Sequence, residues 1–313
     1  MSIWVVQKQM IMIFVFILIG VYLYKKGHLS NMSSRQLSWI IVNITNPITL
    51  LCAALKEEEK VPAGELGIAF LCFVLMYAML IPLAYLIPLA LGIKKEDRYA
   101  YRMMSIFGNV GFIGIPFAAA VLGTKSLIFV SICGLTFNLI AYTYGMAVMR
   151  KIGDEQHPDR HAESTFTWKN VINSGTVISI LAILLYIADF PVPEDITTGL
   201  SYIGNTTTFM SMIVLGVSVA QMVPKEVFSK WSLYVFVILR QIIVPIILIF
   251  ILRPFIKSEL ILSTVVVMAA MPAANMPLMM AKQYGVKDDI ISAGIILTTL
   301  LSIVTIPVVM MFL

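Results

Sequence analysis

The sequence predicts an all-α polytopic membrane protein with ten transmembrane helices, arranged as two inverted five-helix repeats. Three observations lead to this prediction: the composition, ten long apolar stretches, and like residues that recur at a nearly constant offset. Of the 313 residues, 59% are hydrophobic and only 12% are charged. A soluble domain has about 45–50% apolar and about 25% charged residues. The chain therefore has too few polar side chains to cover a soluble fold, and helices that bond their own backbone within lipid are the alternative.

A helix needs roughly 20 apolar residues to cross the hydrocarbon core of a bilayer. Short polar segments such as 56–60, 94–98 and 150–163 separate apolar stretches near this length. The first stretch has no small-residue cleavage site and ends on Tyr24 and Lys25, which is typical of a retained helix anchored at the membrane surface. The ten predicted spans are 9–25, 38–55, 66–91, 99–121, 126–149, 168–188, 198–221, 230–252, 260–281 and 290–312.

Most Lys and Arg residues fall in the loops that follow spans 1, 3, 5, 7 and 9, and cytoplasmic loops are the ones that carry such an excess. This bias predicts a multi-pass protein of the cell membrane with both termini outside and residues 150–167 in the cytoplasm. The net charge of +5 follows from this placement, and no basic patch interleaved with aromatic residues indicates nucleic acid. The predicted cytoplasmic set is Lys25, Lys26, Arg35, Lys94, Lys95, Arg98, Arg102, Arg150, Lys151, Arg160, Lys169, Lys225, Lys230, Lys282 and Lys287.

Residues 1–149 and 168–313 are predicted to be two related repeats of five helices, joined by a linker at 150–167. Because five is odd, the second repeat must enter the membrane from the opposite side. Inverted repeats of this kind are typical of secondary transporters, whose site lies near the midplane between the halves. The alternative is a coincidental arrangement in a receptor or scaffold. Pairs at or within one residue of an offset of about 162 are Tyr24 and Tyr186, Asn43 and Asn205, Thr45 and Thr207, Pro82 and Pro245, Lys95 and Lys257, Pro116 and Pro277, Gly123 and Gly285, and Thr136 and Thr298.

Spans 4 and 9 each carry a segment that should interrupt the helix near its middle. Span 4 reads GNVGFIGIP over 108–116, and span 9 reads MPAANMP over 271–277. Proline removes a backbone donor and clashes with the preceding turn, so both helices are expected to break. An unwound crossing can hold an ion with backbone groups and helix dipoles, whereas the alternative is a kinked pair that only packs closely. The predicted substrate-binding residues at this crossing are Asn109, Pro116, Pro272, Asn275 and Pro277.

Few charged side chains are available inside the membrane. All 17 acidic residues lie in loops or at span edges, which argues against a carboxylate proton relay and a carboxylate-built sodium site. Arg240 lies in mid-span, and such an Arg needs a partner. It either attracts an anion or bonds to carbonyl groups of a broken neighbouring helix. Asn43 and Asn205, which match between the repeats, and Asn138 and Tyr142 of span 5 are predicted to complete the substrate site.

Together these motifs resemble the auxin efflux carrier family. The resemblance rests on GNVGFIGIP and MPAANMP, on the Arg-Gln-apolar-Pro segment at 240–245, and on Asn-x-x-x-Pro at 43–47, and it covers nearly the whole chain. It implies a ten-helix inverted repeat with crossing broken helices 4 and 9, a fold shared with bile-acid/sodium symporters. It also implies a scaffold of spans 1, 2, 6 and 7 that can form a homodimer, and a moving transport domain of spans 3–5 and 8–10, as in an elevator. Implied substrates are auxin-like or malate- and malonate-like organic anions. The short linker and the lack of a carboxylate in span 3 set the chain apart from plant members.

The leading functional hypothesis is a secondary carrier for a small organic anion. A sodium-coupled symporter of the bile-acid type is the second, because Asn, Thr and backbone carbonyl groups can coordinate sodium. A channel or signalling scaffold is the third. No enzyme activity, cofactor or metal site is predicted, since HExxH is absent and Cys52, Cys72 and Cys133 lie singly within apolar runs.

Overall fold

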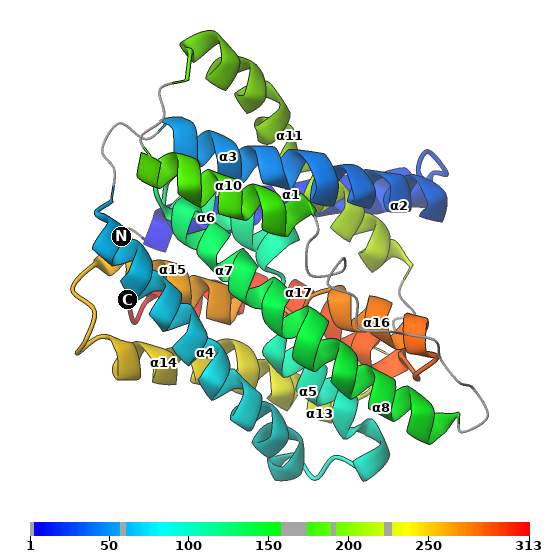
Figure 1. The fold of residues 1–313 in the computed structure, drawn as a ribbon. Helices are drawn as coiled ribbons and strands as arrows, with labels where there is room; N and C mark the ends of the chain where they lie inside the picture. Colours follow the sequence, from blue (N-terminus) through cyan, green and yellow to red (C-terminus); the bar gives the residue numbers. More distant parts are fainter. Residues whose placement is uncertain (1–2, 57–60, 158–173, 189–191, 222–226) are drawn as a thin grey trace.

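The computed structural model describes residues 3–56, 61–157, 174–188, 192–221 and 227–313. Every regular element in these residues is helical, and the pairing of extended residues is limited there to one isolated bridge (Figure 1). The predicted all-α class is therefore confirmed for this part of the chain. The first half contains α1 (Ile3–Lys25), α2 (Asn31–Ile40), η1 (Ile41–Thr45), α3 (Asn46–Lys56), α4 (Ala63–Ala90), η2 (Lys95–Asp97), α5 (Arg98–Ile106), η3 (Val110–Gly114), α6 (Ile115–Val121), α7 (Ser126–Ile140), η4 (Ala141–Gly145) and α8 (Met146–Gln156).

The second half contains α10 (Ser174–Ala188), α11 (Glu194–Ala220), α13 (Trp231–Ile238), η5 (Leu239–Ile243), α14 (Val244–Leu252), α15 (Glu259–Ala270), α16 (Met276–Tyr284) and α17 (Asp289–Met310). Among the described residues, seven continuous helices are long and apolar enough to cross a membrane. Shorter apolar helices, Val110–Val121, Thr176–Ala188 and Glu259–Ala270, lie where spans 4, 6 and 9 were predicted. Spans 4 and 9 are short because they are interrupted, and the predicted start of span 6 lies outside the described residues.

Three of the π-helical turns share a local sequence feature, because a proline follows the start of each turn by six residues. The prolines are Pro47 after η1, Pro116 after η3 and Pro245 after η5. A proline ring clashes with the carbonyl group four residues earlier, and in each case that residue lies within the widened turn. The expectation that Pro116 breaks span 4 is therefore wrong, since Val110–Val121 is one continuous helix. The interruption lies earlier, at residues 107–109, where Phe107 is extended.

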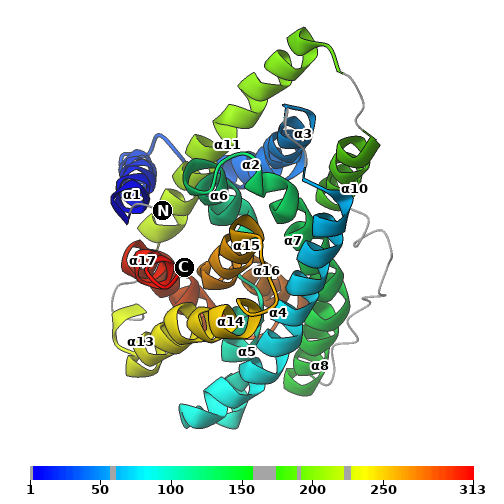
Figure 2. The same cartoon turned by 90° about the vertical axis from the view of Figure 1, so that its left-hand side faces the viewer.

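The helices form two packed groups that Figures 1 and 2 show from two sides. One group contains α1, α2, α3 and α11, with α10 packed on α3, and the other contains α4, α5, α13, α14, α15 and α17. α15 is enclosed within the second group, since its residues from Thr264 to Ala270 are all buried. A helix that is apolar on every side belongs in a core, so the interrupted span 9 runs through the interior.

Two glycines let α1 and α11 cross at backbone contact. A Cβ atom added to Gly20 would lie 2.4 Å from the carbonyl oxygen of Ile213, and one added to Gly216 would lie 2.2 Å from that of Ile17. Neither oxygen can move without moving its helix. Small residues at such crossings allow the close approach that stabilises helix pairs in membranes.

We expect Gly216→Ala to lower the free energy of unfolding by about 1–3 kcal/mol, the usual cost of forcing extra volume into a packed interface. Gly199→Ala on the same helix is the matched control, because its Cβ would have no neighbour within 4 Å. Alanine is the better helix former by about 1 kcal/mol, so this control should not lower stability. Thermal unfolding of both purified variants in detergent provides the measurement, and equal midpoints would contradict the interpretation.

Candidate functional site

The interruptions of spans 4 and 9 pair with each other through the backbone. The N–H of Asn109 donates to the carbonyl oxygen of Pro272 at 2.7 Å, and the N–H of Ala274 donates to the carbonyl oxygen of Phe107 at 2.9 Å. The residues between these bonds form the isolated antiparallel bridge. Unwound backbone inside a membrane protein must find partners within the protein. Each interruption supplies the partners of the other, so the two breaks stabilise one another.

Arg240 joins the C-terminal ends of the two half-helices at this crossing. Its Nε donates to the carbonyl oxygen of Ser105 near the end of α5, and its Nη1 donates to that of Ala269 near the end of α15. The amides that would normally bond these carbonyls, at Asn109 and Ala273, have other partners. The buried guanidinium thus satisfies two carbonyl groups at the negative ends of helix dipoles. This arrangement matches the structural interpretation of Arg240 rather than the anion-attracting one.

α17 supports the interruption of span 9 from behind. The N–H of Ala273 donates to Thr298 Oγ1 at 3.1 Å, and Gln241 Nε2 donates to the carbonyl oxygen of Thr298 at 3.2 Å. Thr298 and Gln241 are both buried. A buried polar group is stable only when it is hydrogen-bonded, so this contact fixes where the unwound segment lies.

Asn109 begins the second half-helix of span 4 and retains an unused donor. Its Oδ1 accepts the N–H of Phe112 at 3.0 Å, which caps η3. Its Nδ2 is buried and has no hydrogen-bond partner among the described residues. Because Oδ1 is held by the cap, the amide orientation is determined and Nδ2 must be the free end. A buried donor without a hydrogen bond costs about 1–3 kcal/mol of stability. A ligand that accepted a hydrogen bond from Asn109 Nδ2 would therefore recover that cost.

A cavity of about 500 Å³ adjoins the crossing, and its lining comes from η1, α3 and α10 on one side and from η3, α6, α7 and α16 on the other. Five of the ten predicted site residues line it: Asn43, Asn109, Asn138, Tyr142 and Asn275. No Asp, Glu, Lys, Arg or His belongs to its lining among the described residues. Its polar groups are therefore neutral amides, hydroxyls and backbone, set in a mostly apolar wall.

Several of these side chains already have partners. Asn43 Nδ2 donates to the carbonyl oxygen of Trp39 at 2.9 Å, and Asn138 Nδ2 donates to Thr176 Oγ1 at 3.0 Å. Both amides already donate to a group of the protein, so they are secondary candidates for holding a ligand. Asn109 remains the strongest candidate donor.

The other five predicted residues lie elsewhere. Asn205 is exposed on α11 and does not line the cavity, although its repeat mate Asn43 does. Pro272 and Pro277 shape the interrupted span 9 without forming the cavity wall, and Pro116 is buried in α6. Arg240 bonds behind the crossing, as described above. Matching positions in two repeats therefore do not place both members at one site.

Asn46 also lines the inner cavity, although it is not one of the ten predicted site residues. Its Nδ2 donates to the carbonyl oxygen of Gly111 at 3.4 Å, and its Oδ1 is buried with no partner among the described residues. In the sequence it stands directly before Pro47, in a segment with several other polar residues, and nothing there distinguishes it from them. It links the first helix group to the second half-helix of span 4.

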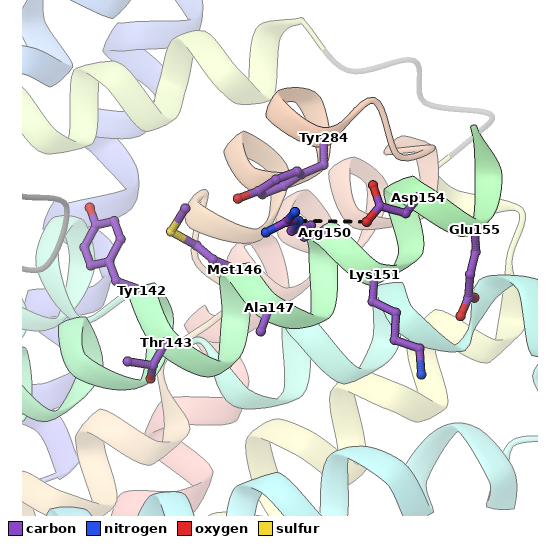
Figure 3. Close-up of a pocket in the computed structure, with 9 residues that line it drawn as sticks. All are labelled: Tyr142, Thr143, Met146, Ala147, Arg150, Lys151, Asp154, Glu155 and Tyr284. Carbon is purple, nitrogen blue, oxygen red and sulfur yellow. Dashed lines mark ion pairs between the residues drawn. The ribbon is translucent and has the colours of Figure 1, made fainter. Parts of the chain in front are cut away.

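A second cavity of about 730 Å³ continues from the first along α8, and the two share Tyr142 and Met146. Figure 3 shows Arg150 and Asp154 one turn apart on α8, with the ring of Tyr284 opposite. Their ion pair is 3.8 Å long and both side chains are about half exposed, so it adds little to stability. This outer cavity carries charges of both signs, and none of its described lining residues has a buried donor without a partner. The inner cavity is therefore the stronger candidate site.

The described residues contain no group of three His, Cys, Asp or Glu side chains that could hold a metal ion.

The inner cavity can hold a small molecule whose acceptor group points toward Asn109 and Asn275 and whose apolar body lies against the wall. Backbone and amide donors at a helix N-terminus favour an anion there.

Comparison with known proteins gives two matches. The sequence model of a family described as "Membrane transport protein" matches residues 5–310. The chain is also similar to an uncharacterized transporter of Methanocaldococcus jannaschii, with 25% identity over 315 residues that cover 95% of each chain.

Proposed function

The chain belongs to the family of membrane transport proteins that includes the auxin efflux carriers, and on this premise we propose that it is a secondary carrier for a small organic anion. The family match confirms the resemblance inferred from the motifs of spans 2, 4, 8 and 9. Several apolar helices of sufficient length agree with a multi-pass membrane protein. The substrate, the mechanism and any coupling ion are what this proposal adds.

One observation carries the proposal. The unpartnered Nδ2 of Asn109 lies at the crossing of two interrupted helices and lines the inner cavity. In this proposal a substrate carboxylate accepts from Asn109 and from the amide of Asn275, with the N-terminus of η3 adding positive potential. Neutral donors bind an anion less tightly than an ion pair would, and a carrier must release its substrate on the other side.

The mostly apolar wall favours a carboxylate with an apolar body, such as an auxin-like acid. A malate- or malonate-like acid would leave its second carboxylate without a cation among the described lining residues. Because burying an unpaired charge is costly, the dicarboxylate is the less favoured of the two substrate types.

We propose an elevator mechanism on a ten-helix inverted repeat, with spans 1, 2, 6 and 7 as scaffold and spans 3–5 and 8–10 as the moving domain. The packing into two helix groups supports this division. The inner cavity lies between residues of spans 2 and 6 and residues of spans 4, 5 and 9. Hydrogen bonds between these two sets include Asn46 to Gly111 and Asn138 to Thr176. Both could break as the groups slide. Both termini outside, the linker in the cytoplasm, the cell membrane as location and a scaffold-mediated homodimer belong to the same proposal.

Asn46 gives a specific reason to keep sodium coupling as a second candidate. Its buried Oδ1 is an acceptor without a partner among the described residues, and an acceptor repels a carboxylate. A sodium ion or a substrate N–H or O–H would satisfy it instead.

Purified protein in liposomes tests the proposal. We expect saturable uptake of a radiolabelled aromatic monocarboxylate, accelerated when the same acid is loaded inside. A channel would show no such acceleration, and absence of uptake across monocarboxylates and dicarboxylates would contradict the proposal. Running each assay with and without a sodium gradient decides between the two modes of coupling, since only the symporter responds to the gradient.

A further inference from the structure

A cluster of Tyr85, Arg102 and Tyr144 lies outside both cavities. The guanidinium carbon of Arg102 on α5 is 4.2 Å from the centroid of the Tyr85 ring on α4. The hydroxyl of Tyr144 on η4 donates to that of Tyr85 at 2.9 Å. Three elements therefore converge on one cation, and none of the three residues lines either cavity.

Among the described residues, no carboxylate forms an ion pair with Arg102. The ion pairs between described residues join Arg150 with Asp154 and Lys282 with Asp288. Arg102 Nε is buried and has no hydrogen-bond partner among those residues, although the residue as a whole is part-exposed. An arginine in a membrane-spanning helix needs an anionic or carbonyl partner. A cation–π contact alone leaves its hydrogen-bond donors unused.

The cluster lies near one membrane surface. Tyr85 precedes the end of α4 by five residues and Arg102 follows the start of α5 by four. At 1.5 Å per residue, both lie roughly 6–8 Å from the loop between the helices. That loop carries Lys94 and Lys95, and cation-rich loops adjoin the headgroups of anionic lipid.

The surface beside the cluster is apolar and exposed. Leu86 and Leu89 on the last turns of α4 are 57% and 50% exposed, and Tyr85 itself is 37% exposed. A soluble anion has no apolar part that could pack on this face, whereas the acyl chains of a lipid would pack along these leucines. Charge and apolar surface together indicate an amphipathic anion.

We propose that Tyr85, Arg102 and Tyr144 bind the phosphate of an anionic phospholipid such as phosphatidylglycerol. The planar guanidinium suits two parallel hydrogen bonds to phosphate oxygens. Tyr144 donates to Tyr85, so the Tyr85 hydroxyl keeps its own proton for the phosphate. The acyl chains lie against Leu86 and Leu89. The site is independent of the substrate cavity and of the proposed transport activity.

Native mass spectrometry of the detergent-purified protein with added phosphatidylglycerol or phosphatidylcholine tests this site. Arg102→Gln should weaken phosphatidylglycerol binding by about fivefold, the effect of one basic residue at an anionic membrane surface, and should not change phosphatidylcholine binding. Tyr85→Phe should cause a smaller loss. Arg150→Gln is the matched control, since Arg150 lines the outer cavity and pairs with Asp154, and it should bind like the parent.

Unchanged preference for phosphatidylglycerol in both Arg102→Gln and Tyr85→Phe would overturn the proposal. Competition by soluble glycerol phosphate at concentrations equal to the lipid would also overturn it, because the site would then select a soluble anion. If Arg102→Gln does not fold, Tyr85→Phe and Arg102→Lys decide the question. The lysine keeps the charge but loses the two-bond geometry. Arg102→Lys should therefore bind phosphatidylglycerol more weakly than the parent, with a loss of affinity no larger than that of Tyr85→Phe.

Discussion

Asn109→Asp is expected to abolish carboxylate binding, with a loss of at least about 100-fold. The substitution keeps the oxygen that caps η3 by accepting the N–H of Phe112, so the helix start should survive. It removes the unpartnered Nδ2 donor and replaces it with a negative charge facing the cavity. A hydrogen bond to a charged group is worth about 1.5–3 kcal/mol, which by itself is roughly 10- to 150-fold. Repulsion between two carboxylates adds to that loss.

Uptake in liposomes and thermal stabilisation by the substrate measure this effect, with expression and monodispersity as checks on folding. Asn205→Asp is the matched control, because the same chemical change occurs on an exposed residue of α11 outside the cavity. It should transport at the parental rate. If Asn109→Asp still transports, or if Asn205→Asp loses transport to the same degree, the site does not lie where we place it.

Arg240→Gln is expected to lower the free energy of unfolding by about 2–6 kcal/mol. The shorter side chain cannot reach both the carbonyl oxygen of Ser105 and that of Ala269, and each buried acceptor left without a partner costs about 1–3 kcal/mol. The crossing of the two interrupted helices should loosen as a result. Thermal unfolding and size-exclusion chromatography measure the change.

The control for this prediction is Arg150→Gln, whose parent side chain is about half exposed and pairs with Asp154. It should leave the unfolding midpoint within a few degrees, since surface pairs contribute little. A folded, monodisperse Arg240→Gln protein with parental stability and weakened substrate binding would support the anion-attracting interpretation instead.

How much of the structure can be predicted from the sequence differs between elements. The GNVGFIGIP and MPAANMP segments correctly indicated that spans 4 and 9 are interrupted, because glycine and proline act locally on the backbone. The interruption does lie near the middle of span 4, but proline is not its cause. Pro116 is accommodated by a π turn, and the helix instead opens at residues 107–109, where the backbone of span 9 offers hydrogen bonds. A partner that lies more than 160 residues away in the chain cannot be seen in a local pattern.

In the candidate site, too, some residues can be selected from the sequence and others cannot. Asn43, Asn109, Asn138, Tyr142 and Asn275 could be selected because polar residues in apolar spans are few. Asn46 and Asn205 could not be sorted correctly, since both lie on helices with several polar neighbours. Which face of such a helix meets the cavity depends on how it packs against the others.

By itself, the sequence determined that the chain is helical, apolar enough for a membrane, interrupted in spans 4 and 9, and related to a family of transporters. The first three properties follow from composition, from the length of the apolar stretches and from the local effects of glycine and proline, whereas the relation to the family follows from the resemblance of its motifs. Only the tertiary structure decided that the two interruptions form hydrogen bonds to each other and that Arg240 donates to carbonyl groups at the C-terminal ends of their first half-helices. It also decided that Asn109 Nδ2 has no partner among the described residues. Each of those outcomes depends on which distant groups satisfy a buried hydrogen bond. The cost of an unmade bond is large, but its partner is chosen by the packing of the whole chain.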